Sequence, residues 1–221
     1  DLPSKTPLYF NLHEKASGRS DDLPKGHTTI IGPSNAGKTV ILTTLDALFQ
    51  KYGIRSYFFD RNAGCEIYIR AMQGHYHRLT PGEPTGWNPC QLNDTTTNRA
   101  FLRDFLEALS NNKQNPLTPA DLNQIAEVVE RNYSLAFEKR NLSNIASFFR
   151  LDFSGLESLN RYCRSLDRHG KSGDRAYLFD NEQDTFNTSA NTLGFDMTHW
   201  LSDAGEPPEE LLPMSMYLFH R

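Results

Sequence analysis

A glycine-rich loop near the start of the chain limits its possible folds more than any other feature. Residues 32–39 read Gly-Pro-Ser-Asn-Ala-Gly-Lys-Thr and match G-x-x-x-x-G-K-[ST] at every fixed position. The glycines let successive backbone N–H groups turn toward one anion, and the start of a following helix adds further N–H donors. Lys38 supplies a cation for the β- and γ-phosphates, and the Thr39 hydroxyl suits the shell of Mg²⁺. The sequence therefore predicts a loop that binds ATP and Mg²⁺.

The predicted site extends one residue into the following helix. Lys38 is also predicted to act in catalysis, and Thr39 is the predicted metal ligand. The predicted nucleotide-binding residues are Gly32, Pro33, Ser34, Asn35, Ala36, Gly37, Lys38, Thr39 and Val40.

The segments around this loop have the pattern of an α/β protein. Residues 28–31 are short, apolar and β-branched, which predicts a buried strand. Apolar residues at spacings of three, four and seven predict an amphipathic helix over 40–49. Residues 54–59 then predict a second strand, which ends at Asp60. Strand, loop, helix and strand form one β-α-β unit, so we expect a parallel sheet.

The rest of the chain divides into three predicted parts. We expect the first part of the nucleotide-binding domain at 1–98, an all-helical insertion at 99–175, and a return to the α/β core at 176–221. Within these parts we predict an edge strand or hairpin over 1–26 and loops over 61–98. We predict helices over 101–109, 156–166 and 211–220, and a further helix that begins at Thr118-Pro119. Further strands are predicted at 176–179 and 193–196.

Composition narrows the possible classes of protein. The net charge of -4 gives no general attraction to nucleic acid or anionic lipid, so any DNA contact needs a local basic patch. Three widely spaced cysteines favour reduced thiols over a disulfide framework. No run approaches the ~20 apolar residues that a transmembrane helix needs. The chain has no starting Met and ends abruptly at Arg221, so we expect a fragment of a longer protein.

Several ordered motifs resemble the TrbE/CagE/VirB family of conjugation and type IV secretion ATPases. The similar segments span most of the chain, which makes them more specific than the phosphate loop alone. They are Thr6-Pro7-Leu8-Tyr9-Phe10-Asn11, residues 26–33, Phe59-Asp60 with residues 64–72, Pro84-Thr85-Gly86-Trp87-Asn88-Pro89, residues 98–104, Phe179-Asp180-Asn181 and residues 193–198. Asn62-Ala63 departs from the family, which often has Asp-Arg at this place, and this puts a catalytic role for the pair in doubt.

The resemblance implies a RecA-like motor domain of the HerA/FtsK type that carries an all-helical insertion. It also implies a hexamer-like homo-oligomer that works with other inner-membrane subunits of a type IV secretion system, at the cytoplasmic face of the bacterial inner membrane. ATP hydrolysis would energise pilus assembly or the transfer of protein or DNA. The family's Asp-Glu strand, which carries the acidic Walker B residues, is absent from residues 1–221, so we expect it beyond Arg221.

Two acidic residues are candidates for chemistry at the phosphates. Glu66 follows the strand after the phosphate-loop helix, where RecA-like motors can place the carboxylate that orients water; the alternative is a solvated Glu at a helix start, paired with Arg70. Asp180 follows an apolar triplet and imitates a metal-shell residue, but Asn181 and Glu182, which come next, favour a turn cap.

Other interpretations of the chain remain open. Arg161, Arg164 and Arg168 would form one stripe on a helix over 156–166 and beyond, which suits DNA contact or a solvated face. An ATP-binding scaffold with little turnover is the alternative to a motor. A P-loop small-molecule kinase is a third possibility, although the helical tract lacks the dense arginines of a kinase lid.

Overall fold

The computed structural model describes residues 26–112, 115–166, 170–201 and 207–221. It forms two compact units, residues 1–51 and 52–221, which are described separately. The predicted edge strand or hairpin over 1–26 and the motif at residues 6–11 lie almost entirely outside the described residues.

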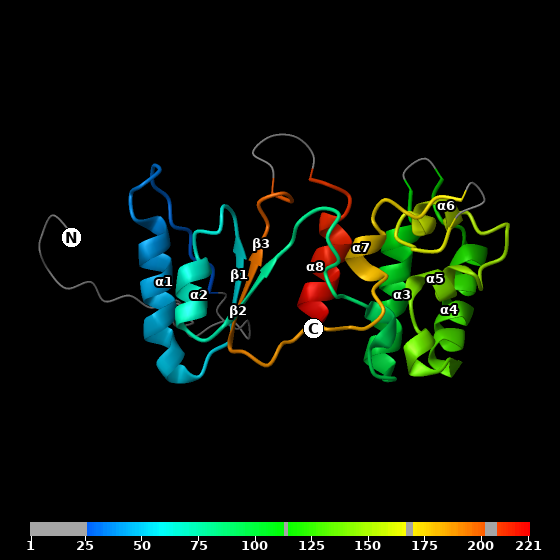
Figure 1. The fold of residues 1–221 in the computed structure, drawn as a ribbon, viewed down its shortest axis with the longest axis horizontal. Helices are drawn as coiled ribbons and strands as arrows, with labels where there is room; N and C mark the ends of the chain where they lie inside the picture. The colour runs from blue at the N-terminus through cyan, green and yellow to red at the C-terminus, as the bar shows by residue number, and fades with distance from the viewer. Residues whose placement is uncertain (1–25, 113–114, 167–169, 202–206) are drawn as a thin grey trace, which may run out of the picture. The chain divides into compact units, whose positions relative to one another are not determined.

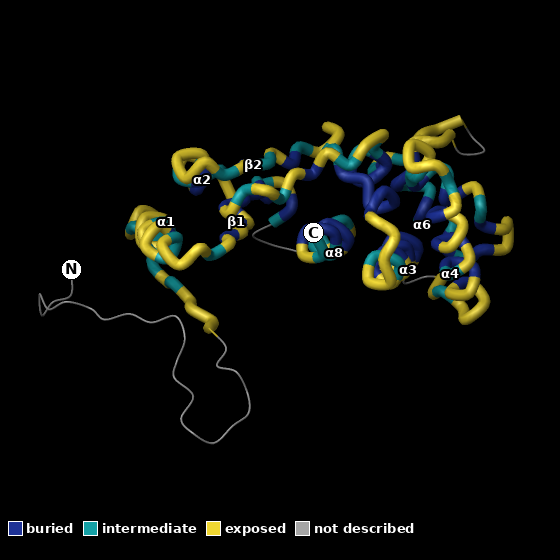
Figure 2. Tube along the Cα trace, turned by 90° about the horizontal axis from the view of Figure 1, so that it is seen from below, coloured by how far each residue is buried: buried dark blue, intermediate teal, exposed yellow. Residues whose placement is uncertain are grey.

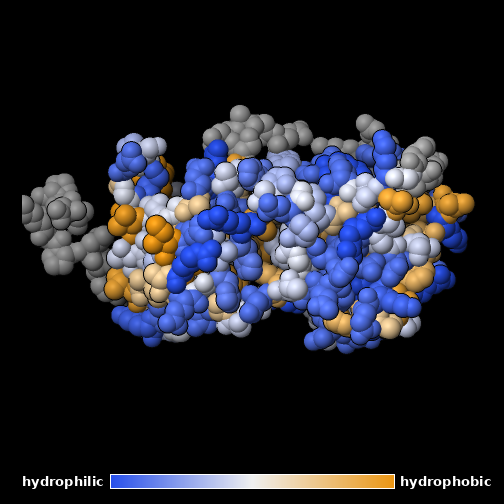
Figure 3. All heavy atoms as spheres, viewed as in Figure 1, coloured by the Kyte–Doolittle hydropathy of each residue, from blue (hydrophilic) through white to orange (hydrophobic). Residues whose placement is uncertain are grey.

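The first unit consists of the glycine-rich loop and the helix that follows it. Helix α1 spans Lys38–Phe49 and continues into a 3-10 turn, Gln50–Tyr52, which confirms the predicted helix. Most of α1 is exposed in Figure 2, and apolar side chains lie at its surface in Figure 3. The largest of these are Val40, Ile41, Leu42 and Leu48.

The strand predicted over residues 28–31 is not present. Residues 26–33 belong to no strand in the part of the chain that the structure describes, and the Ile31 side chain is 90% exposed. β-branched residues favour an extended backbone, but a strand exists only where a neighbouring strand pairs with it. The composition of this segment therefore did not decide whether it pairs with another strand.

The second unit contains a parallel three-stranded sheet. Its strands are β1 (Ser56–Asp60), β2 (His75–Arg78) and β3 (Thr192–Asp196), in the order β1-β3-β2. Asp60 lies opposite Asp196, and Arg78 also lies opposite Asp196. The predicted strands at 54–59 and 193–196 are confirmed as β1 and β3. Strand β2 lies in a segment predicted as loop, because its His-Tyr-His-Arg sequence has little apolar signal.

Helices cover both faces of this sheet (Figure 1). On one face, α2 (Glu66–Ala71) packs its Ile69 against Phe58 and Tyr76. This approach requires Gly194, since a Cβ there would lie 2.4 Å from Ile69 Cδ1 and 2.6 Å from Tyr76 Cδ2. On the other face, Phe59 meets Phe195 and, from α8 (Leu211–His220), Phe219. The predicted helix over 211–220 is thus confirmed.

A group of helices shares the large core of the second unit with α8. These helices are α3 (Thr96–Ser110), α4 (Pro119–Ser134), α5 (Leu142–Ala146), α6 (Leu156–Asn160) and α7 (Ala176–Phe179), with 3-10 turns η2 (Pro89–Gln91) and η3 (Phe137–Lys139). The predicted start of α4 is confirmed: Thr118 and Asp121 form a reciprocal capping box, and Pro119 is the first helical residue. All three cysteines are buried free thiols.

Two predicted elements among these helices are wrong. Residues 176–179 form the helical turn α7 instead of a strand, because Ala176, Leu178 and Phe179 all enter the core and a short apolar run does not distinguish the two. The helix predicted over 156–166 ends at Asn160. The Cys163 carbonyl and the Arg161 carbonyl accept the N–H groups of Gly173 and Arg175, so tertiary bonds replace the continued helix.

Candidate functional site

The glycine-rich loop folds as a series of tight turns before α1. Asn35 and Gly37 both have left-handed backbones, with φ of 64° and 83°, and Gly37 is the residue before the helix. The Ala36 N–H donates to the Pro33 carbonyl at 3.3 Å, and the Ile41 N–H donates to the Gly37 carbonyl at 3.0 Å. The helix therefore begins inside the motif. Its first backbone N–H groups have no partner within the helix, as at any helix start.

Lys38 reaches back across this loop. Its ammonium Nζ donates to the Gly32 carbonyl at 2.8 Å and to the Pro33 carbonyl at 2.7 Å. A Cβ on Gly32 would lie 3.3 Å from Ala36 Cβ, so the loop closes tightly at this point. The first turn of α1 contains no acidic residue. One cation and a helix N-terminus without opposing negative charge fit a phosphate chain, and nucleotide binding by residues 32–40 stays a prediction.

Glu66 lies at the first position of α2, at the carboxyl end of the sheet. Its carboxylate is paired with Arg70 at 2.8 Å and with Arg78 at 3.0 Å, and its side chain is only 15% exposed. Hydrogen bonds from Arg78, and then from Arg70, lower the pKa of Glu66. The predicted pair with Arg70 is therefore present. Such a carboxylate stays ionised, so it suits accepting a hydrogen bond from a water better than removing a proton.

Asp60 fixes the turn that leads from β1 to Glu66. Its buried Oδ2 accepts the Cys65 N–H at 2.7 Å and the Tyr76 hydroxyl at 3.1 Å. Burial, followed by the charge of Asp60, raises the pKa of Tyr76. The sequence placed Asp60 at a strand end but gave no sign of Tyr76 as its partner, because β2 was not predicted.

The departure at Asn62-Ala63 has a structural role at this turn. Both residues have left-handed backbones, with φ of 66° and 52°. The Asn62 N–H donates to the Thr198 hydroxyl at 2.8 Å, and Thr198 in turn is bound by Asp196. Asn tolerates this conformation better than Ala, so Ala63 carries local strain.

Asp180 has a structural role and does not resemble a metal-shell residue. It follows helix α7, and its fully buried carboxylate accepts the Arg164 N–H at 2.6 Å and the Ser143 N–H at 3.2 Å. No group of three or more His, Cys, Asp or Glu side chains is placed to hold a metal ion among the described residues. Asp180 therefore ties α5, the segment after α6, and α7 together.

The predicted arginine stripe is not formed. Arg161 follows the end of α6 and pairs with Asp174 and Glu209, while Arg164 lies near Asp180 and Glu182. Arg168 lies outside the described residues. Because the helix ends before these residues, their helical spacing does not align them. DNA contact stays a prediction, and an aligned arginine stripe does not support it.

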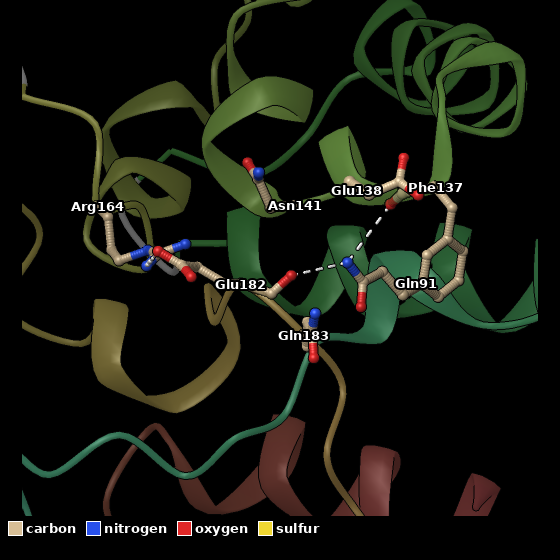
Figure 4. Close-up of a pocket in the computed structure, with 7 residues that line it drawn as sticks. All are labelled: Gln91, Phe137, Glu138, Asn141, Arg164, Glu182 and Gln183. Atoms are coloured by element: carbon tan, nitrogen blue, oxygen red, sulfur yellow. Dashed lines mark hydrogen bonds and ion pairs between the residues drawn. The ribbon is translucent and has the colours of Figure 1, made fainter.

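A polar cavity of about 400 Å³ lies among the helices of the second unit (Figure 4). The Gln91 amide connects η2 to residues 182–184 at this cavity, since Nε2 donates to the Glu182 carbonyl at 2.9 Å and Oε1 accepts the Asp184 N–H at 2.9 Å. The Arg164 and Glu182 side chains point toward one another on one side of it, with Nη1 3.9 Å from Oε1. None of the residues predicted for nucleotide binding lines this cavity, and the Gln91 amide is bonded to the surrounding backbone.

The loop and the parallel sheet together define a class: a RecA-like P-loop nucleotide-binding fold. The structure of VirB4 of Thermoanaerobacter pseudethanolicus has the same fold, with a TM-score of 0.57 and 15% identity over 86% of this chain and 55% of that chain. The fold predicted from the sequence is thereby confirmed. No family model matches the chain.

Closer relatives are found among curated proteins. The type IV secretion system protein PtlC of Bordetella pertussis is 37% identical over 99% of this chain and 28% of its own length. The type IV secretion system proteins virB4 of Bartonella henselae and Brucella abortus are 35% and 34% identical over 98% and 99% of this chain. The chain is homologous over nearly its whole length to these VirB4 and PtlC proteins, as its motifs predicted. It spans 26% to 28% of these relatives' own length.

Proposed function

We propose that this chain is the nucleotide-binding part of an ATPase that energises a type IV secretion or conjugation apparatus. The observation that carries the proposal is the loop at residues 32–40, where left-handed turns, a helix start and the Lys38 ammonium form a phosphate-binding arrangement. Kinship with VirB4 and PtlC proteins, which are named as type IV secretion proteins, supplies the context.

The residues of the loop would divide the work of holding ATP with Mg²⁺. Backbone N–H groups of residues 32–39 would bind the phosphates, and Lys38 would leave the loop carbonyls to pair with them. Thr39 would contribute its hydroxyl to the metal, which supplies charge neutralisation at the phosphates when bound. Glu66 would orient the attacking water, since its ionised carboxylate is a strong hydrogen-bond acceptor.

The wider setting of the protein is part of the proposal. We expect a hexamer-like homo-oligomer that joins other type IV secretion subunits at the cytoplasmic face of the bacterial inner membrane. No helix in the described ranges combines the length and apolar character needed to cross a membrane. We also propose that residues 1–98 and 176–221 contribute to the nucleotide-binding domain, with 99–175 as a helical insertion.

Binding and hydrolysis of ATP by the full-length protein test this function. We expect Lys38→Ala to lower the turnover of Mg²⁺-ATP by roughly 100-fold, because it removes an electrostatic contact to the transferring phosphate. The matched control is Lys51→Ala, which removes a lysine from the end of the same unit and should retain turnover. Steady-state phosphate release and fluorescent nucleotide titration are the measurements.

Three results discriminate among the candidate functions. Failure of the wild-type protein to bind Mg²⁺-ATP would refute the proposal. Secretion that survives in Lys38→Ala cells, but not in cells that lack the protein, would instead identify an ATP-binding scaffold. Transfer of the γ-phosphate to a small acceptor, detected in a coupled assay, would identify a kinase.

A further inference from the structure

Arg78 is the last residue of β2, and its guanidinium donates hydrogen bonds to both carboxylate oxygens of Glu66, a paired arrangement that we call the grip. Nη2 of Arg78 lies 3.0 Å from Oε2 and 3.3 Å from Oε1 of Glu66. Arg70 binds the same carboxylate from within α2, with its Nε 2.9 Å from Oε1. The Glu66 side chain is 15% exposed, whereas the two arginine side chains are 57% and 67% exposed. The carboxylate is therefore enclosed by two cations that themselves face outward.

The chain makes a sharp return to place Arg78 there. After α2, the Gly74 N–H donates to the Ile69 carbonyl at 2.9 Å, and a Cβ on Gly74 would lie 2.3 Å from the Thr192 carbonyl oxygen. Only a residue without a side chain fits this close approach to β3. Strand β2 then pairs in parallel with β3 and ends at the edge where β1 also ends.

The buried Asp60 carboxylate holds in place the segments that carry Arg78 and Glu66. Tyr76 and Arg78 are two residues apart, so they share one face of β2. The Tyr76 hydroxyl donates to Asp60, and Asp60 also accepts the Cys65 N–H directly before Glu66. Asp60 thus joins the strand that carries Arg78 to the helix start that carries Glu66. Asp60 therefore constrains Arg78 and Glu66 through contacts between segments distant in the sequence, whereas Arg70 is placed by helix α2 itself.

We propose that Arg78 is a positioning residue that holds the Glu66 carboxylate in place for the water that attacks ATP. The inference rests on the proposed function, because Glu66 has this task only if ATP is hydrolysed. The carboxyl ends of parallel strands are where ligands bind in open α/β sheets, and Arg78, Asp60 and Glu66 gather at that edge. Arg78 acts through Glu66 and need not touch the nucleotide.

The charges around Glu66 make the proposal testable by pH. Hydrogen bonding by Arg78 is the largest influence that lowers the Glu66 pKa, and Arg70 adds to it. Removal of Arg78 therefore raises the Glu66 pKa, so protonation begins at a higher pH. The charged and titratable groups around this carboxylate are Arg70 and Arg78, then Tyr76 and Asp196 beside Arg78, and Asp60 beside Tyr76.

The test compares Arg78→Ala, Arg78→Lys and Arg70→Ala in the full-length protein. For Arg78→Ala we expect kcat for Mg²⁺-ATP to fall roughly tenfold with little change in KM, because positioning of the water is impaired after binding. The acid limb of the kcat profile should move to higher pH. Lysine at residue 78 restores one donor and should recover part of both effects, and Arg70→Ala should have a smaller effect than Arg78→Ala.

Several outcomes would overturn the inference. Wild-type kcat and an unmoved acid limb in Arg78→Ala would show that the grip has no part in hydrolysis. A lower kcat with an unmoved acid limb, and no recovery in Arg78→Lys, would show a merely structural role. If Arg78→Ala fails to fold, the pH profile of Arg78→Lys decides. Wild-type protein that binds no Mg²⁺-ATP would instead refute the proposed function itself, which separates the two failures.

Discussion

The phosphate loop and the Glu66 region are built in different ways. The side-chain bonds of Lys38 reach residues only five and six positions away. Around Glu66, Arg78 lies 12 positions away, Tyr76 lies 16 positions from Asp60, and Thr198 lies 136 positions from Asn62. Because the loop depends on its own sequence, its motif is recognisable in isolation. The Glu66 region exists only where the sheet has brought distant segments together.

The largest expected effect on stability comes from Asp180, which belongs to the long-range class. Asp180→Ala leaves the Ser143 and Arg164 N–H groups without their buried acceptor, and we expect a loss of about 3 kcal/mol. Amide hydrogen exchange in the full-length protein measures the local free energy of opening. Exchange in α5 and α7 should accelerate while that of α1 should not change.

Glu182→Ala is the matched control for Asp180, since its side chain is 88% exposed and lies two residues away. We expect less than about 0.5 kcal/mol for this exposed substitution. Equal effects from the two variants would contradict the view that Asp180 organises the helices.

A smaller effect is expected at Gly194, where α2 meets the sheet. Gly194→Ala places a Cβ 2.4 Å from Ile69 Cδ1, and we expect a cost of about 2 kcal/mol from overpacking. Exchange should accelerate in α2 and β2, and ATP turnover should fall because Glu66 moves with α2. The double variant with Ile69→Val removes the clashing methyl and should recover part of the loss; no recovery would show that the strain lies elsewhere.

The smallest effect on stability is expected at the N-cap of α4, which depends only on residues next to it in the sequence. Thr118→Ala removes the cap that binds the Asp121 N–H, and we expect a loss of about 1 kcal/mol, confined to the start of α4. Thr96→Ala, within the first turn of α3, removes a threonine that is not the cap and should be nearly neutral. If Thr118→Ala instead opened the whole helical group, local and long-range features would not be separable.

The sequence predictions were accurate for features that depend on neighbouring residues and less accurate for features that depend on distant ones. Helices α1, α4 and α8 were predicted because caps and apolar spacing act within a few residues. Strands β1 and β3 were predicted from short buried apolar runs. Residues 28–31 and 176–179 have similar runs but form no strand, since pairing and core position are decided by distant residues.

The roles predicted for residues 32–40 and Glu66 stay predictions. The structure describes their local setting: tight turns precede α1, and Glu66 begins α2 after β1. Arg78 and Tyr76 were missed, because nothing in the His-Tyr-His-Arg segment indicates which strand it joins. For Asp180 the sequence favoured a turn cap over a metal-shell residue, and its buried N–H partners, which the sequence did not identify, show a structural role.

The sequence by itself determined the glycine-rich loop, the capped helices and the homology to VirB4 and PtlC proteins, all of which depend on residues close together along the chain or on their order. Only the tertiary structure decided the order β1-β3-β2 and the grip of Arg78 on Glu66. The physical reason is that turns and helices satisfy their backbone hydrogen bonds locally, whereas a parallel strand and a buried carboxylate obtain theirs from segments that the chain order leaves far apart.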